Sequence, residues 1–165
     1  MSETTPAEPT EPPWDGQAAA DAIRAKAQTF LLRETEIGLD QRGRLFIERG
    51  STRANIEFIP REPTKQVYIL ITCPIAFYVP ASPALFERVA RDTDKWYWGH
   101  LGIGTYEEGG EHAGQLYIYL SHTILGDFLD PDELLTPLWS MLNVADEQDN
   151  IYVTEFGGAV YDGTQ

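Results

Sequence analysis

Cysteine is scarce in this 165-residue sequence, and basic residues are missing from its second part. The single cysteine, Cys73, excludes an intramolecular disulfide framework and a multi-cysteine zinc site, and it fits a reducing compartment. No apolar run approaches the roughly 20 residues that span a bilayer. The acidic, proline-rich start lacks the basic and apolar regions of a secretory signal. We therefore expect a cytoplasmic protein without a membrane anchor.

The distribution of charge limits the partners. All twelve Lys and Arg residues lie at or before Lys95, whereas twelve of the 26 Asp and Glu residues follow it. Nucleic-acid-binding proteins neutralise phosphates with clustered Lys and Arg, so we expect no nucleic-acid partner. Anionic membrane surfaces would be repelled for the same reason. A basic protein segment is the partner that this field would attract. The simpler interpretation is that the acidity only keeps the protein in solution.

Apolar residues at helical spacing predict three helices. The first covers residues 17–35, and the second starts at a serine–proline pair and covers about residues 83–93. The third starts at Asp130, whose side chain can cap the helix ahead of a proline. Pro137 removes a helical hydrogen bond, so we expect a kink or a short 3₁₀ start there. Beyond Asn150 the chain is expected to be irregular or to form a brief strand.

Five apolar runs bounded by turn residues predict strands. Gly50 in a short turn predicts that the first two form a hairpin. Short links make neighbouring strands antiparallel, with the helices mainly on one face. Residues 1–16 are expected to be a disordered, acidic, proline-rich tail, and residues 17–165 to form one α+β two-layer domain with a five-stranded antiparallel sheet and the order αβββαββα. The predicted strands cover residues 45–49, 54–59, 67–73, 96–106 and 115–121.

Six short segments between residues 67 and 158 carry a resemblance to a known family: 67–71, 84–89, 116–120, 127–134, 145–149 and 156–158. With these segments the chain resembles the YbjN family of bacterial proteins, described broadly as sensory transduction regulators. The resemblance implies a type III secretion chaperone-like fold with the same element order. It also implies a non-enzymatic, protein-binding domain that is often a homodimer, and it brings no catalytic residues.

Three histidines and one cysteine are the strongest candidates for chemistry. His100, His112 and His122 could converge near Cys73, but no two of them have the close spacing of metal ligands on one element. A lone cysteine at the end of an apolar strand is more often a small buried hydrophobe than a nucleophile. We therefore expect no catalytic residue, no metal and no cofactor. A small enzyme using His100 or His122, or a small-ligand sensor, remains an alternative.

The best candidate for binding is an aromatic sheet face. Because strand residues alternate sides, Trp96, Trp98, Tyr117, Tyr119 and Tyr68 are expected on the face opposite the aliphatic residues. Tryptophan and tyrosine with few charges nearby are typical of the centre of a protein interface. The sequence therefore predicts a chaperone-like adaptor or regulator that recognises a basic or amphipathic protein segment, as a homodimer. The alternatives are that the rings are core covered by the chain itself, or that the protein is a purely structural dimer.

Overall fold

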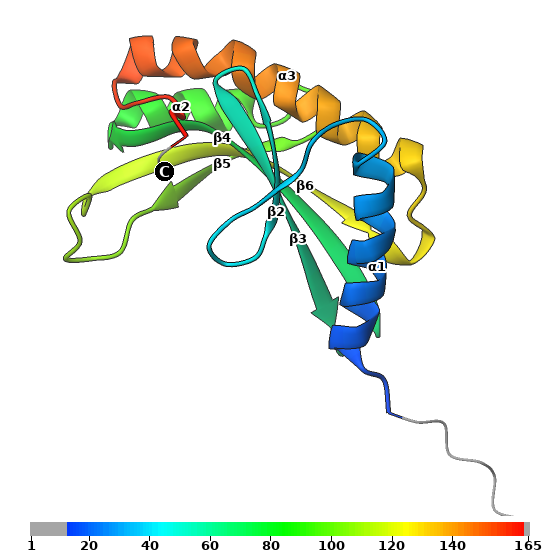
Figure 1. The fold of residues 1–165 in the computed structure, drawn as a ribbon. Coiled ribbons are helices and arrows are strands. Elements are labelled where there is room, and N and C mark those ends of the chain that lie inside the picture. The colour runs from blue at the N-terminus through cyan, green and yellow to red at the C-terminus, as the bar shows by residue number, and fades with distance from the viewer. Residues whose placement is uncertain (1–12, 164–165) are drawn as a thin grey trace, which may run out of the picture.

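The computed structural model describes residues 13–163, so most of the tail predicted for residues 1–16 lies outside the described part of the chain. Figure 1 shows a twisted sheet with helices packed on it. In chain order the elements are α1 (Gly16–Leu31), β1 (Gly38–Leu39), β2 (Leu45–Arg49), β3 (Thr52–Arg61), β4 (Gln66–Pro80), α2 (Pro83–Asp92), β5 (His100–Thr105), β6 (Gln115–Leu125), the 3₁₀ turn η1 (Gly126–Phe128) and α3 (Pro131–Phe156).

The strands of the described chain form one six-stranded sheet in the order β1-β2-β3-β4-β6-β5. Each neighbouring pair is antiparallel, which confirms the predicted α+β class. The predicted number of five strands is wrong, because Gly38 and Leu39 pair with β2 as an additional edge strand. A two-residue strand is too short to show the alternating pattern by which strands are recognised in a sequence.

The helix starts follow the predicted capping. The Ser82 hydroxyl accepts the backbone N–H of Leu85 at 3.2 Å, and the Asp130 carboxylate accepts that of Glu133 at 2.8 Å. Pro137 lies inside α3, which is α-helical from Pro131 onward, so the 3₁₀ start is not observed and the kink stays a prediction. The helix also continues past Asn150, because apolar residues such as Tyr152 keep facing the core at helical spacing.

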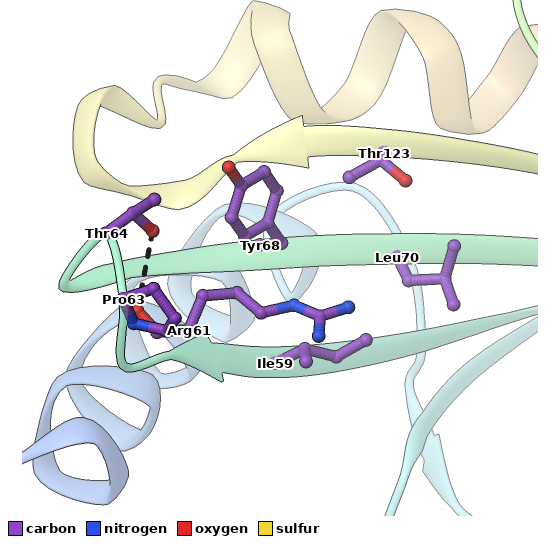
Figure 2. Close-up of a pocket in the computed structure, with 7 residues that line it drawn as sticks. All are labelled: Ile59, Arg61, Pro63, Thr64, Tyr68, Leu70 and Thr123. Atoms are coloured by element: carbon purple, nitrogen blue, oxygen red, sulfur yellow. Dashed lines mark hydrogen bonds between the residues drawn. The ribbon is translucent and has the colours of Figure 1, made fainter.

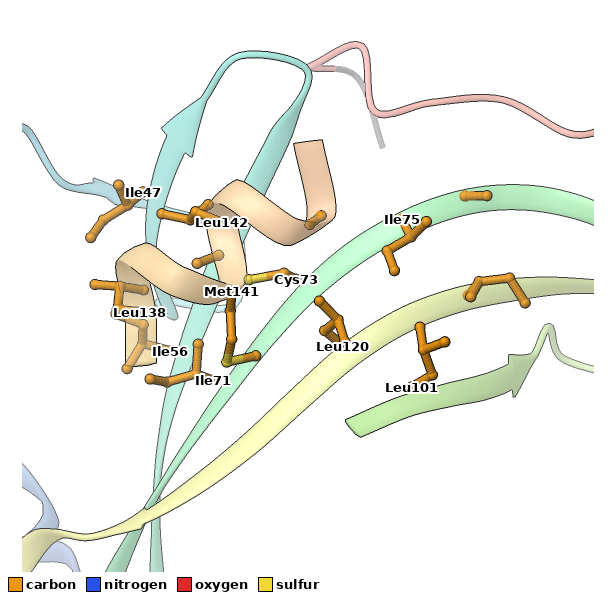
Figure 3. Packing of buried hydrophobic residues seen from close by; sticks show 14 of the residues in the cluster. Ile47, Ile56, Ile71, Cys73, Ile75, Leu101, Leu120, Leu138, Met141 and Leu142 are labelled. Atoms are coloured by element: carbon orange, nitrogen blue, oxygen red, sulfur yellow. The ribbon is translucent and has the colours of Figure 1, made fainter. Parts of the chain in front are cut away.

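The core lies between the sheet and one layer formed by all three helices. Alternate strand residues, including Ile56, Ile71 and Leu120, meet apolar residues of the helices in one cluster. Figure 3 shows Leu138 and Met141 of α3 packed over these strands. No helix formed by residues 13–163 lies on the opposite side of the sheet, and we call that side the open face. This arrangement confirms that the helices lie mainly on one face.

β4 is longer than predicted and irregular in its second half. Its pairing with β6 shifts register between Pro74 and Ala76 and again before Val79. Proline cannot donate to a strand ladder, so a bulge is its expected place in a central strand. Beyond it, β4 is no longer paired with β3, and Phe77 instead exchanges backbone hydrogen bonds with Ala159. The bend turns Phe77 and Tyr78 toward the open face, where they contribute to the site described below.

The strand predicted for residues 96–106 is shorter than expected. β5 begins at His100, whereas residues 95–98 form bends and Gly99 has no regular secondary structure. Gly99 has φ of +84°, a left-handed conformation that no regular strand contains. The strand start expected at Trp96 is therefore wrong, and the alternation used to place Trp96 and Trp98 does not apply.

Candidate functional site

Three tyrosines predicted at the binding surface lie on the open face. Tyr117 and Tyr119 alternate along β6 with buried Leu116, Ile118 and Leu120. Tyr68 lies on β4, between buried neighbours that face the helices. All three tyrosines are half-buried, so part of each ring is accessible to a partner. Their role in binding stays a prediction, but their placement gives it a definite surface.

Glycines in β5 make room for the two β6 tyrosines. Gly102 pairs with Tyr119 in register, and Gly104 pairs with Tyr117. A Cβ atom added at Gly102 would lie only 2.5 Å from Tyr119 Cζ, and one at Gly104 would also meet the Tyr117 ring. The rings therefore lie flat across β5 instead of standing away from the sheet, because the facing strand has no side chains there.

These tyrosines belong to a longer row of rings. The ring centroids of Tyr119 and Tyr117 are 5.6 Å apart, and those of Tyr117 and Tyr106 are 5.5 Å apart. Tyr106 stacks on Tyr78 at 5.4 Å, and Tyr78 lies 4.0 Å from the ring of His112. Such spacings suit aromatic pairs and fix the rings against one another. Tyr78 has a φ of 56°, a backbone conformation that costs free energy for a residue with a side chain. This conformation accompanies the position of its ring in the row.

Three hollows follow one another across the open face. The first, of about 570 Å³, contains Tyr68 and Leu70 in its wall (Figure 2). The second, of about 400 Å³, is bordered by Leu70, Tyr117 and Tyr119. The third, of about 730 Å³, lies between Tyr117 and Phe46. Because Leu70 and Tyr117 are shared between neighbouring hollows, the three form a continuous path along the sheet, lined by aromatic and aliphatic side chains together with charged ones.

The charged residues beside this path are mainly arginines. Arg44 binds Asp40 at 2.6 Å and Glu57 at 3.0 Å. Burial alone would raise the pKa of the Asp40 carboxyl, but the hydrogen bonds and charge of Arg44 outweigh it and hold that pKa below its usual value. Arg53 donates to Asn55 and to the Tyr161 hydroxyl, and its guanidinium lies 4.7 Å from the centre of the Phe46 ring.

The two tryptophans are placed elsewhere, and the prediction that they lie on the open face is wrong. Both pack against the core cluster, which lies on the helix side of the sheet. The ring centroids of Trp98 and His122 are 5.3 Å apart in an edge-to-face arrangement. His122 alternates with Tyr119 and Ser121 along β6, so it lies on the side opposite to them. Tyr97, between the two, is 91% exposed. A role of Trp96 and Trp98 in partner binding stays a prediction, on a surface separate from the tyrosines.

The groups considered for catalysis do not come together. His100 pairs with Ser121 and lies on the open side, bound to Asp94 at 3.1 Å, whereas His122 lies on the helix side. Burial lowers the pKa of His122, and the charge of His100 lowers it further. Cys73 is fully buried, and burial raises the pKa of its thiol. Within the described chain, no group of three or more His, Cys, Asp or Glu side chains could hold a metal ion.

Several residues of the surface were missed in the sequence. Phe46 alternates with Leu45 and Ile47 in the predicted hairpin, so its face could have been read from that strand. The positions of Phe77 and Tyr78 depend on the bulges of β4, which leave no pattern in the sequence. Tyr106 is the residue directly after β5, so the alternation along that strand does not place its ring in the row.

Comparison with known proteins supports the fold. No family model and no curated protein matches this chain, so membership of the YbjN family stays a prediction. A chain of the solved structure "Crystal Structure of the ExsC-ExsE Complex" is similar, with 15% sequence identity over 81% of this chain and 94% of that chain, and a TM-score of 0.51. At this identity the similarity concerns the fold alone, and it supports the chaperone-like fold expected from the sequence. None of the helices in the described residues has the length and apolar character of a membrane span.

Proposed function

We propose that this chain is a non-enzymatic protein-binding module, a chaperone-like adaptor or regulator that holds a segment of a protein partner on its open face. The observation that carries the proposal is the continuous path of half-buried rings beside three hollows. Tyrosine buries a large apolar area while its hydroxyl can still bond a partner, and it is enriched among residues that dominate binding energy. An extended segment would fit such a path better than a compact ligand would.

The structural comparison is consistent with this function. The similar chain belongs to a solved complex of two proteins, ExsC and ExsE, which favours a protein partner for this fold. A cytoplasmic location, a YbjN-like regulatory role and a homodimer remain part of the proposal. A second copy of the chain is the main competing occupant of the open face, because a purely structural dimer would also cover exposed rings.

The test removes one ring of the open face and compares it with a ring outside it. Tyr119→Ala should reduce the affinity for a partner isolated with the full chain by roughly 30-fold, the loss expected for an interface anchor of about 2 kcal/mol. Tyr97→Ala is the matched control, because Tyr97 is 91% exposed and lies away from the path. Equal capture by Tyr119→Ala and the wild type would contradict the proposal. Light scattering should be run on both, since dissociation of a dimer by Tyr119→Ala would identify a second copy as the occupant.

A further inference from the structure

Most of the acidic residues after Lys95 lie away from the open face. Three of the twelve lie in the loop between β5 and β6, and eight lie between Gly126 and Phe156, in the helical layer or at its start. The last is Asp162, in the C-terminal segment. None of them borders the three hollows. Eight of the twelve negative charges of the second part of the chain therefore lie in the helical layer or at its start, away from the proposed binding surface.

The side chains that border the hollows include more positive charges than negative ones. Arg42, Arg44, Arg53 and Arg61 stand there against two carboxylates, and both of these bind the single Arg44. Among the described carboxylates other than Asp162, none lies within ion-pair distance of the other three arginines. Figure 2 shows Arg61 reaching over Ile59 at the edge of the first hollow.

Arg53 is the best-positioned of these arginines. Its guanidinium lies between two rings, with its carbon 4.7 Å from the centre of the Phe46 ring and 5.3 Å from that of Tyr161. It donates to the Asn55 side-chain oxygen at 2.9 and 2.6 Å and to the Tyr161 hydroxyl at 3.2 Å. These bonds use neutral acceptors and hold the group in one orientation. Glu48 pairs with Arg53 across β2 and β3 and accepts from the same Tyr161 hydroxyl at 2.7 Å, but it does not bind the guanidinium directly. A fixed guanidinium with remaining N–H donors is suited to a carboxylate.

We propose that the segment held on the open face is acidic, with Asp or Glu side chains alternating with aromatic or aliphatic ones. Its carboxylates pair with Arg53 and Arg42, and its apolar side chains lie on Tyr117 and Tyr119. This proposal rests on the proposed function and names the chemistry of its partner. It reverses the sign expected from the sequence, where the overall charge of −14 favoured a basic segment. Local charge at an interface decides which partner is accepted, because unlike charges must meet at contact distance.

The test uses a phage-displayed library of random twelve-residue peptides, selected on the full chain. The enriched peptides should combine aromatic or aliphatic residues with an excess of Asp and Glu over Lys and Arg. The most enriched peptide, made synthetically, should lose at least tenfold in affinity for Arg53→Glu and for Tyr119→Ala. Arg42→Glu repeats the charge test at an exposed loop residue, in case Arg53→Glu does not fold. Arg33→Glu is the control, since this exposed arginine follows α1 and borders none of the hollows.

The outcomes separate the two proposals. Enriched peptides rich in Lys and Arg that lose affinity for Tyr119→Ala would overturn the acidic segment while leaving the protein-binding face intact. Peptides that bind Tyr119→Ala as tightly as the wild type, or no enrichment at all, would overturn both. Equal losses for Arg33→Glu and Arg53→Glu would show that only the overall charge matters, which also overturns the local pairing.

Discussion

Gly102 is the position where a single added methyl group should test the geometry of the open face. Its φ is not in the left-handed region, so an alanine can adopt the same backbone conformation. The added Cβ atom would lie 2.5 Å from Tyr119 Cζ and 2.7 Å from the Tyr119 hydroxyl. Carbon atoms pack at about 3.5 Å or more, so the far end of the ring must move away by roughly 1 Å.

The expected loss of stability is small, because two effects oppose each other. Overpacking costs about 1–3 kcal/mol when rigid neighbours cannot give way. Replacing glycine in a strand with alanine recovers roughly 0.5–1 kcal/mol. The net change in the free energy of unfolding should be about 0.5–2 kcal/mol, or a fall in Tm of roughly 1–8 °C for a domain of this size. The effect on binding should be larger, since the ring that borders the second hollow is displaced.

The assay compares Gly102→Ala with Gly110→Ala by urea unfolding, near-ultraviolet circular dichroism and partner capture. Gly110 lies in the loop after the same strand, also outside the left-handed region, and an added Cβ would have its nearest contact at 3.4 Å. We expect a changed tyrosine signal and weakened capture only for Gly102→Ala. If both variants have the same Tm, the same near-ultraviolet spectrum and the same capture as the wild type, Tyr119 does not lie across β5 and the surface is wrongly described.

Three further predictions follow from burial and charge. Cys73 should resist a thiol reagent in native buffer and react once the chain is unfolded in urea, because it is fully buried and burial raises its pKa; rapid native labelling would contradict this. Burial alone would raise the pKa of Asp92, but the hydrogen bond from Arg88 at 2.7 Å outweighs burial and lowers that pKa below the usual 3.8. The ionised Asp92 therefore stabilises the fold fully above about pH 4, and this contribution is lost as the pH falls further. Acid titration of Tm should be less steep for Asp92→Asn, and an unchanged slope would refute the assignment. Trp98→Ala should lower the free energy of unfolding by roughly 1–3 kcal/mol, whereas exposed Tyr97→Ala should change it by less than about 0.5 kcal/mol; similar values for both would place the Trp98 ring in solvent.

The sequence predicted the placement of the tyrosines on the open face correctly, because their strands are regular there. Along β6 the period of two separates Tyr117 and Tyr119 from Leu116 and Leu120, so the open face could be read before the structure was known. The same argument failed for Trp98, because it assumed that the strand began at Trp96, before Gly99, whereas β5 begins at His100. A glycine with positive φ ends the alternation, and a glycine alone does not show which φ it will adopt.

The fold was more predictable than the site for a related reason. Helix starts at Ser82 and Asp130 depend on neighbouring residues, so local sequence is sufficient to place them. The additional edge strand β1 and the pairing of Phe77 with Ala159 depend on contacts between distant segments. The open face is built partly from such contacts, since the bend of β4 directs Phe77 and Tyr78 to it.

The distribution of charge in this chain shows why composition along the sequence is a weak guide to the charge of one face of the fold. The acidic half contributes two kinds of element to the fold, a strand and a long helix. β6 has no Asp, Glu, Lys or Arg, whereas α3 and the residues before it hold most of the carboxylates after Lys95. Because the strand lines the open face and the helix covers the other side, the tyrosines and the carboxylates of one sequence segment are separated by the thickness of the sheet and its core. The arginines of the first half, carried by β3 and the loops beside it, then set the local charge around those tyrosines.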